Sequence, residues 1–294
     1  MKTSITIMTP TYNRKETLSR LYDSLLKQSY KEFVWLIIDD GSTDGTKNYI
    51  DELIKMNHLK IYYHFQENSG KYVAHNTGVK LCDTELFVCV DSDDYLMPDA
   101  IEKTLSFWEM NNHDDSIAGI LSPRKMNTRS GMMNAPSISR MMDLYNKNQI
   151  VGETCLVFKT SVLKQFLFPE TPGEKFMTET VVYHRIDEKY RMLIQNDYLM
   201  IGEYRPDGLS NNAEVVQWRS PVNALIAFKV NAAYQSSFIK AVKAVGCYYA
   251  WKKIRKLSAI TMYKRIPFIR QIIGFLLFPH YYSLFLKLKR KFES

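Results

Sequence analysis

The strongest constraint on the fold is a regular alternation of apolar runs and amphipathic segments through the first 111 residues. Short apolar runs predict strands, and segments whose apolar residues recur every three or four positions predict helices. The alternation predicts four strands, at 4–8, 33–38, 59–65 and 85–90, and a helix after each, at 15–28, 44–56, 70–81 and 98–111. Strands and helices that alternate with short links predict a parallel sheet with helices on both faces.

Polar side chains gather where the predicted strands end. The clusters are Thr9–Asn13, Asp39–Asp44, Gln66–Gly70 and Asp91–Asp94. Because ligands of open α/β sheets bind beyond the carboxyl ends of the strands, these four clusters form the candidate functional site.

The chain after Ser122 follows a less regular pattern. A polar, methionine-rich segment at 124–136 predicts a long loop. The later segments predict a strand at 154–158, a helix at 176–189 and further strand structure at 190–204. Helical texture dominates from residue 212 to the end, so we expect a helical C-terminal region after the α/β part.

Positive charge is concentrated at the C-terminal end. Residues 251–294 hold eleven Lys and Arg and one acidic residue, a net charge of +10, whereas the rest of the chain carries −2. Basic clusters alternate there with aromatic residues and short apolar runs, a pattern typical of helices that lie on an anionic membrane. The alternative is a solvated basic face that packs on the rest of the protein. Nucleic acid is not expected as a partner, because the chain shows no nucleic-acid-binding motif.

The cysteines and the N-terminus predict a cytoplasmic location. The four cysteines lack metal-binding spacing, and three lie in apolar runs, as buried reduced thiols do. The N-terminal apolar run is too short and too polar for a signal peptide. The longest uncharged stretch, 271–286, is shorter than the roughly 20 residues of a membrane-spanning helix. We therefore expect a peripheral protein at the inner face of the membrane.

Three of the strand-end clusters suit a phosphorylated ligand. Asp91 and Asp93 follow a buried strand and offer the oxygen ligands that Mg²⁺ and Mn²⁺ prefer, although this spacing is also common in ordinary turns. Asp39 and Asp40 can accept hydrogen bonds from base N–H groups or ribose hydroxyls. Lys71 opens a helix, and a helix N-terminus with a lysine favours phosphate. The fingerprints of dinucleotide-binding and P-loop proteins are absent from the sequence.

Four motifs in this order resemble those of the inverting family 2 glycosyltransferases with a GT-A fold: SITIMTPTYNR, IIDDGSTDGT, ENSGKYVAHNTGV and FVCVDSDDYLMPD. The resemblance covers residues 1–125 closely and 150–210 loosely. It implies an α/β catalytic domain of the GT-A kind at 1–210, with a nucleotide-sugar-binding half at 1–125 and an acceptor half at 126–210. Residues 211–294 then form a helical, basic and aromatic extension.

The resemblance also implies how a nucleotide-sugar donor, uridine-linked in this prediction, is held at its base. Thr9, Pro10 and Tyr12 frame the base, with the Tyr12 ring beside it. Asp40 accepts the base N–H, and Asp39 supports the loop on which Asp40 lies.

The remaining donor contacts follow from the later motifs. Lys71, at the end of the turn that Asn68 begins, approaches the diphosphate. Asp91, next to Ser92, contacts the ribose. Asp93 binds a divalent metal, Mn²⁺ or Mg²⁺, which bridges the two phosphates and stabilises charge on the leaving nucleoside diphosphate.

An inverting transfer also needs a base that deprotonates the acceptor hydroxyl. Members of the family usually place it in a Glu-Asp pair at the start of a helix, whereas this chain has Glu179 followed by Thr180. Glu179 is the candidate base; the alternative is an acid that stabilises the first turn of a helix. The nearby His184 is interpreted as structural rather than as a ligand.

These observations predict an enzyme that transfers a sugar from a nucleotide-sugar to a glycan or lipid-linked acceptor. One alternative is a nucleotidyltransferase, although the Gly-rich basic loop that such enzymes carry after the first strand is missing. The other is a non-catalytic sugar-nucleotide binder, which the missing second acid after Glu179 supports.

Overall fold

The computed structural model describes residues 4–111, 114–126, 130–132, 134–202, 212–235, 237–257, 261–262 and 266–293. The chain divides into two compact units. The first comprises Met1–Leu167 and Lys189–Arg205, and the second comprises Phe168–Glu188 and Pro206–Ser294. The predicted catalytic domain at 1–210 therefore contains a segment, Phe168–Glu188, that clusters with the C-terminal helices.

The first unit combines one large sheet, one small sheet and six helices among its described residues. Its strands are β1 (Ile5–Thr11), β2 (Val34–Asp39), β3 (Ile61–Phe65), β4 (Leu86–Cys89), β5 (Tyr95–Leu96), β6 (Ile117–Met126), β7 (Gly131–Met132), β8 (Ile138–Ser139), β9 (Ile150–Val151), β10 (Thr154–Lys159), β11 (Arg191–Ile194) and β12 (Met200–Gly202). Its helices are α1 (Lys15–Leu26), α2 (Thr46–Met56), α3 (Lys71–Leu81), α4 (Ala100–Asn111), α5 (Met141–Asn146) and α6 (Thr160–Leu163).

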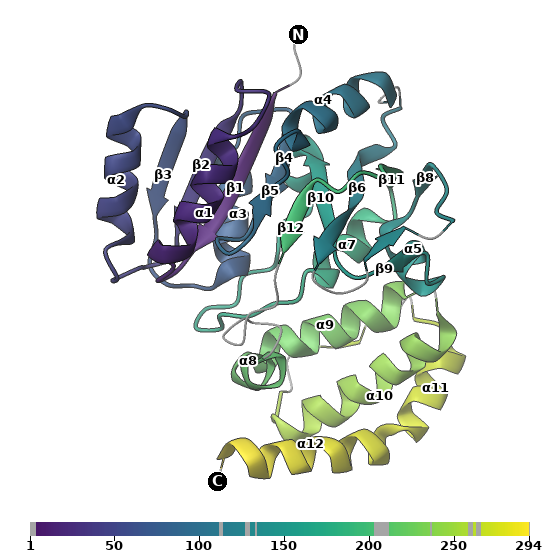
Figure 1. Cartoon of the computed structure of the whole chain (residues 1–294). Helices are drawn as coiled ribbons and strands as arrows, with labels where there is room; N and C mark the ends of the chain where they lie inside the picture. The colour runs from purple at the N-terminus through teal and green to yellow at the C-terminus, as the bar shows by residue number, and fades with distance from the viewer. Residues whose placement is uncertain are drawn as a thin grey trace. The chain divides into compact units, whose positions relative to one another are not determined.

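The large sheet has the strand order β3-β2-β1-β4-β10-β6-β11-β8, as can be followed in Figure 1. Strands β3, β2, β1 and β4 are parallel, which confirms the prediction for the first half of the chain. Strand β10 runs antiparallel between β4 and β6, and β12 pairs with β6 and with the short β5. The sheet is thus mixed but mostly parallel, as expected for the predicted GT-A fold.

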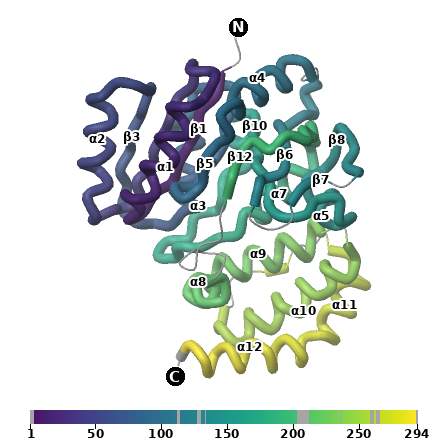
Figure 2. Tube along the Cα trace, viewed as in Figure 1, coloured from purple at the N-terminus to yellow at the C-terminus, as the bar shows by residue number. Residues whose placement is uncertain are grey.

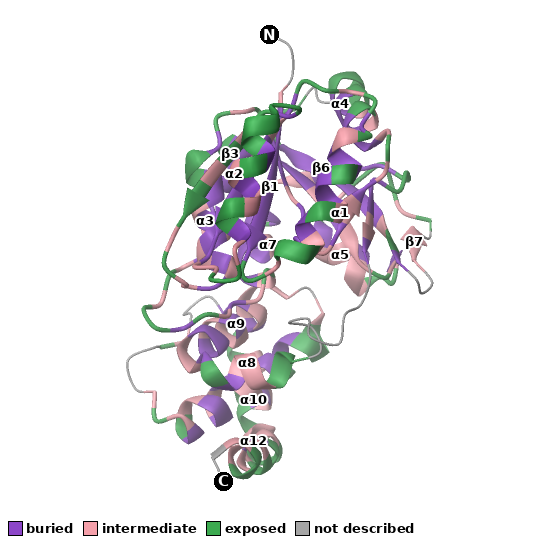
Figure 3. Ribbon diagram, turned by 60° about the vertical axis from the view of Figure 1, so that its left-hand side comes forward, coloured by how far each residue is buried: buried purple, intermediate pink, exposed green. Residues whose placement is uncertain are grey.

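Both faces of β1, β2 and β4 are buried, which explains their continuous apolar runs, whereas the edge strand β3 is half-buried or exposed. Ile7 of β1 belongs to the core cluster that includes Leu21 of α1 and Trp108 of α4. Met8 points to the opposite face, because successive residues of a strand alternate. There a Cβ on Gly78 of α3 would lie 2.6 Å from the Met8 side chain. Figure 3 shows the buried strands between helices whose outer faces are exposed.

The predicted loop at 124–136 is wrong at its start, because β6 continues to Met126. Arg124 is in register with Met200 of β12, and its charge is balanced by acidic side chains, so a polar residue is tolerated in this strand. Gly131 and Met132 form β7, whereas residues 127–129 and 133 lie outside the described residues. The predicted strand at 154–158 is confirmed by β10, and β11 and β12 confirm strand structure within 190–204.

The second unit is helical, as predicted. Its helices are α7 (Thr180–Ile186), α8 (Ala213–Arg219), α9 (Pro221–Tyr234), α10 (Phe238–Ile254), α11 (Phe268–Leu276) and α12 (Phe278–Glu293). Helix α10 contacts α9, α11 and α12, the group traced in green to yellow in Figure 2. Trp251 anchors this packing: its ring meets Trp218 and Phe285, and its indole N–H donates to the Pro221 carbonyl at 2.9 Å.

The predicted helix at 176–189 is shorter in the structure, where α7 spans Thr180–Ile186. The residues before it are held by hydrogen bonds to the start of α9 instead of to their own helix. Glu174 accepts from the backbone N–H groups of Val222 and Asn223 at 2.8 and 2.7 Å. The Asn223 side chain donates to the Phe176 carbonyl at 3.0 Å. Glu174 therefore satisfies N–H groups that the first turn of a helix cannot satisfy itself.

All four cysteines lie among the described residues, and none forms a disulfide. Cys82 and Cys155 are buried, whereas Cys89 and Cys247 are half-buried. No helix in the described part of the chain combines the length and the apolarity needed to cross a bilayer.

Candidate functional site

The carboxyl ends of β1, β2 and β3 lie side by side. Thr11, Asp39 and Phe65 are in register across the three strands. The hydrogen-bond ladder continues one residue further, because Asp40 N–H donates to the Thr11 carbonyl at 2.8 Å and Gln66 N–H donates to the Asp39 carbonyl at 2.9 Å. Three of the polar clusters therefore begin at one edge of the sheet, as predicted.

The loops after β1 and β2 are joined by reciprocal hydrogen bonds. The Asn13 N–H donates to the Ser42 hydroxyl at 2.8 Å, and the Asn13 side-chain oxygen accepts from the Thr43 N–H at 2.7 Å. Asn13 has a left-handed backbone with φ of 51°, a conformation that asparagine tolerates well. These bonds fix the first predicted motif against the second.

Of the three residues predicted to frame a base, Tyr12 is the one with an exposed ring, at 50%. Thr9 is fully buried, and its hydroxyl accepts the indole N–H of Trp35 at 3.0 Å. Pro10 is also buried. Thr9 and Pro10 thus shape the strand end from within, whereas Tyr12 offers a surface for stacking.

Asp39 is fully buried and accepts two hydrogen bonds from its own unit. Its Oδ1 accepts from the Ser42 N–H, and its Oδ2 accepts from the Tyr63 hydroxyl, both at 2.8 Å. Because one donor lies on the loop after β2 and the other on the neighbouring strand β3, the carboxylate holds that loop against the sheet. This geometry agrees with the supporting role predicted for Asp39.

Asp40 holds the loop between β3 and α3. Its Oδ1 accepts from the Gln66 side chain at 2.8 Å and from the Ser69 N–H at 2.9 Å, and its Oδ2 accepts from the Gly70 N–H at 2.7 Å. Gly41 follows with φ of 89°, and a Cβ there would lie 2.9 Å from the backbone nitrogen of Asn68. Glycine is therefore required where the two loops meet.

The loop between β3 and α3 is connected to the turn after β4 through Lys71 and Asp91. The Lys71 Nζ lies 2.8 Å from the Asp91 carboxylate, at the first residue of α3. Burial opposes the charge of Asp91, but Lys71, followed by Arg124, outweighs it and lowers the pKa of the Asp91 carboxyl. Ser92, the next residue, is 7% exposed.

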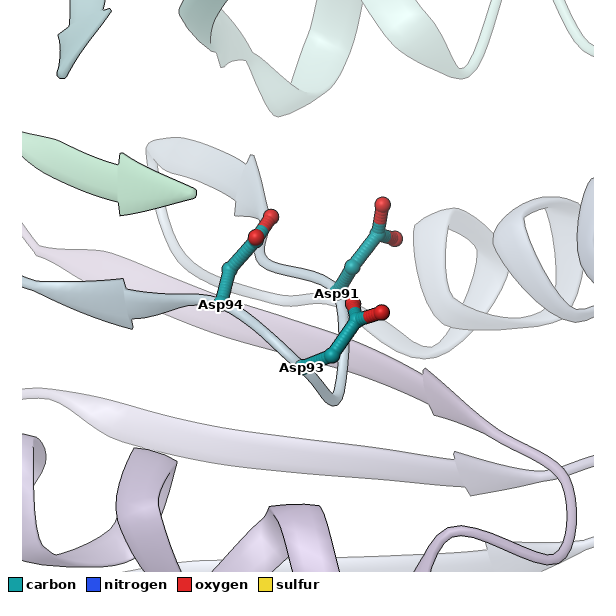
Figure 4. A group of neighbouring side chains, drawn as sticks. All are labelled: Asp91, Asp93 and Asp94. Carbon is teal, nitrogen blue, oxygen red and sulfur yellow. The ribbon is translucent and has the colours of Figure 1, made fainter. Parts of the chain in front are cut away.

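Three carboxylates crowd together on the turn after β4, as Figure 4 shows. Oxygen atoms of Asp91, Asp93 and Asp94 lie within 4.8 Å of one another. Asp94 is 1% exposed. Burial and the neighbouring charge of Asp91 raise the pKa of Asp94 to about 8, against the attraction of Arg124. The arrangement concentrates negative charge at a place where hard cations find oxygen ligands.

Arg124 is a site residue that the sequence analysis missed. Its guanidinium forms an ion pair with Asp94 and donates to Glu153 Oε2 at 2.7 Å. The group lies against Gly202, where a Cβ would be 2.0 Å from the Arg124 Nε. No local signal marks this arginine, because its partners are distant in sequence. The pairing of β6 with β10 brings Glu153 to it, and the pairing of β12 with β6 and β5 brings Asp94.

A second arginine supports the backbone of the acidic turn. Arg20 of α1 donates to the Asp93 carbonyl, and its guanidinium lies 4.6 Å from the centre of the Tyr95 ring. The turn is therefore fixed by a cation on its main chain as well as by the ion pairs of its side chains.

Glu179 belongs to the second unit, whereas the hydrogen-bonded residues described above belong to the first. It is the N-cap residue of α7, is exposed, and its carbonyl accepts the N–H groups of Val182 and Tyr183. His184, one turn later, is 2% exposed and stacks with Tyr234 at 6.5 Å between ring centres. Burial lowers the pKa of His184 to about 4, which favours a structural role.

Relatives of known sequence match about a third of the chain. Glycosyltransferase GlyA of Streptococcus pneumoniae is 37% identical over 98 residues, which are 33% of this chain and 14% of GlyA. The putative teichuronic acid biosynthesis glycosyltransferase TuaG of Bacillus subtilis is 32% identical over 106 residues, 36% of this chain and 42% of TuaG. The matched region thus spans less than half of the length of either relative.

Structural similarity to a solved protein covers nearly the whole chain. The crystal structure of S. aureus TarS 1–349 in complex with UDP-GlcNAc matches with a TM-score of 0.59 and 16% identity, and the match covers 97% of this chain and 92% of TarS 1–349. The model of the family Glycosyl transferase family 2 matches residues 6–167, more than half of the chain. The chain therefore belongs to glycosyl transferase family 2.

Proposed function

We propose that this protein transfers a sugar, with inversion, from a uridine-linked nucleotide-sugar to a glycan or lipid-linked acceptor. The observation that carries the proposal is the continuous network in the first unit, which runs from Asn13 through Asp40 and Lys71 to the acidic turn at 91–94. A nucleoside diphosphate needs a base platform, a hydroxyl acceptor and cations for phosphate, and the network offers each of them. The binding of UDP-GlcNAc by TarS, which has the same fold, supports this donor class.

The base is assigned to Tyr12 and Asp40. Tyr12 presents its exposed ring for stacking. Asp40 Oδ2 accepts one hydrogen bond, from Gly70, and a carboxylate oxygen can accept two. Asp40 can therefore hold a base N–H while it continues to hold the loop, with Thr9, Pro10 and Asp39 supporting the strand ends and Asn68 lying against the turn.

The phosphates and the ribose are assigned to the other end of the network. Lys71 exchanges part of its contact with Asp91 for the diphosphate when the donor binds, because its side chain is 35% exposed and can reach solvent. Asp91 and Ser92 then face the ribose hydroxyls. Lys71 therefore stays beside Asp91 both without the donor and with the donor bound.

The acidic turn fits a divalent metal, Mn²⁺ or Mg²⁺. Among the described residues, the turn brings together three carboxylates, Asp91, Asp93 and Asp94. Burial, together with the charge of Asp91, raises the pKa of Asp94 to about 8. Asp93 is the proposed ligand, while Asp94 stays paired with Arg124. When bound, the metal would stabilise the charge that develops on the leaving nucleoside diphosphate.

Glu179 is the proposed base. It would take the proton of the acceptor hydroxyl as that oxygen bonds to the anomeric carbon and the nucleoside diphosphate leaves. Its position at the start of α7 is supported by the hydrogen bonds that hold Glu174 and Phe176 to the start of α9.

The experiment measures donor binding and product together. Thermal stability is recorded with a panel of nucleotide-sugars and Mn²⁺, where a donor at 100 times its Kd should add about 2.7 kcal/mol. The released product should be a nucleoside diphosphate. Release of pyrophosphate would instead indicate a nucleotidyltransferase, and binding without release above background would indicate a non-catalytic binder.

Glu179→Gln tests the base separately. General base catalysis contributes roughly 10²–10⁴-fold, so the transfer rate should fall by that factor while donor affinity stays unchanged. Glu214→Gln is the matched control, because Glu214 is an exposed acid of the same unit that pairs with Lys291. A loss of less than about tenfold in Glu179→Gln would assign the base elsewhere.

We further propose that residues 1–210 form the catalytic domain and that 251–294 contact an anionic membrane at its cytoplasmic face. The net charge of +10 in that segment supports the contact.

A further inference from the structure

A hollow of about 540 Å³ opens in the second unit, where α10 ends and α11 and α12 follow. Three lysines, Lys252, Lys253 and Lys256, contribute to its lining. Aromatic side chains, Tyr249, Phe275 and Phe278, contribute the rest together with Leu257. One cavity thus presents cations and rings to the same ligand.

Two of the three lysines in the lining, Lys253 and Lys256, have no balancing acid among the described residues. The Lys253 ammonium group instead lies over the rings of Phe278 and Tyr282, at 5.4 and 5.1 Å from their centres. Lys256 follows the end of α10 in a left-handed conformation with φ of 53°. Several ammonium groups around one cavity attract an anion, and phosphate is an anion that lysine binds well.

The aromatic lining continues into an exposed apolar face of α11. Its members recur at helical spacing, and their exposed fractions are 77, 55, 42, 57 and 71% for Phe268, Ile269, Ile272, Phe275 and Leu276. Five large apolar side chains on one face of a nine-residue helix form a surface of the kind that marks an interaction site. Phe275 belongs to both this face and the hollow.

We propose that the hollow binds one anionic phospholipid of a bilayer. Its phosphate lies among Lys252, Lys253 and Lys256, and its hydrocarbon chain leaves past Phe275 along the apolar face of α11. A soluble anion would leave that face uncovered, and an uncharged lipid would leave the charges of Lys253 and Lys256 unbalanced. An amphiphile with a phosphate headgroup covers the apolar face and balances the lysines. The binding site rests on the membrane contact proposed above and gives that contact a defined location.

The test is co-sedimentation of the full chain with vesicles of phosphatidylcholine alone and with added phosphatidylglycerol. Binding should require phosphatidylglycerol. In Lys253→Gln/Lys256→Gln, affinity should fall by about 25-fold, since each basic group at an anionic surface contributes roughly fivefold. The matched control is Lys287→Gln/Arg290→Gln, which removes two charges of the same basic segment outside the hollow. Its loss should be at least about five times smaller.

Equal losses in the two double variants would overturn the site and leave only general attraction to the membrane. Wild-type protein supplies a second measurement that needs no variant. Millimolar inorganic phosphate should leave vesicle binding largely intact, because it cannot cover α11. Complete displacement by phosphate, or a dimer that Phe268→Ser dissociates, would each overturn the lipid assignment. Release of nucleoside diphosphate, assayed without vesicles, reports the catalytic proposal independently.

Discussion

The acidic turns on either side of β1 carry the same type of residue in opposite surroundings. After β2, Asp39 and Asp40 accept five hydrogen bonds, all from neutral donors of the same unit. After β4, the carboxylates lie against each other and against cations, with Asp91 on Lys71 and Asp94 on Arg124.

The comparison separates two uses of a carboxylate at a strand end. Neutral donors on two loops make the first turn a structural connection, whose negative charge is spread over fixed hydrogen bonds. Crowded carboxylates paired with cations make the second turn responsive to an added charge, because Lys71 lowers the pKa of Asp91 whereas burial and the charge of Asp91 raise that of Asp94. The proposed metal chemistry therefore depends on the second turn. The stability of the loops around the site depends on the first.

The largest expected effect is on catalysis, in Asp93→Ala. Loss of a metal ligand removes several kcal/mol of charge stabilisation, so transfer should fall by roughly a thousandfold. The free energy of unfolding should change by less than about 1 kcal/mol, since Asp93 is not part of the core. Asp51→Ala, which removes a surface acid of α2, is the control for both measurements. Near-normal turnover of Asp93→Ala in metal-free buffer would contradict the assignment.

Arg124→Met should destabilise the protein by about 3–5 kcal/mol, because it leaves the buried carboxylate of Asp94 without its cation. Denaturant unfolding measures this cost. The double variant Arg124→Met/Asp94→Leu should recover most of it, since replacing both members of a buried pair is often neutral. If the double variant is as unstable as the single one, the ion pair is not the cause.

Asp40→Ala should lower the free energy of unfolding by about 3 kcal/mol, because three donors on the loop before α3 lose their acceptor. Asp40→Asn keeps one acceptor oxygen and should cost about half as much. Hydrogen exchange of the Ser69 and Gly70 amides locates the change. If Asp93→Ala lowers the free energy of unfolding more than Asp40→Ala does, the structural role belongs to the turn after β4 and not to the turn after β2.

The smallest effect is a pH dependence that arises outside both turns. His184 is held neutral by burial with a pKa of about 4, whereas in the unfolded chain it titrates near 6.5. Between these values the unfolded state binds more protons, so stability falls as the pH drops below 6.5, by at most about 1.4 kcal/mol per unit. His184→Asn should reduce this slope by one proton. An unchanged slope would assign the acid sensitivity to other groups, namely the carboxylates or His75, whose pKa burial also lowers to about 4.

Local patterns were enough to predict the parallel half of the fold. Apolar runs such as Val34–Asp39 and the helical spacing in Lys15–Leu26 report burial of the segment itself, so β1 to β4 and their helices follow from the sequence. The candidate residues at those strand ends were also identifiable, because in a parallel sheet all carboxyl ends meet at one edge. Glycine at Gly41 likewise reflects a local requirement for positive φ.

Tertiary structure alone decided what those residues contact. In the sequence, the acidic residues at the two strand ends look alike. The pairing of β6 with β12 brings Arg124 to Asp94, and the loop before α3 supplies the donors for Asp40. It also decided that the segment before Glu179 is held by α9 rather than continuing as helix. The physical reason is that burial patterns are written locally in a chain, whereas hydrogen bonds and ion pairs between distant residues depend on which segments the fold places together.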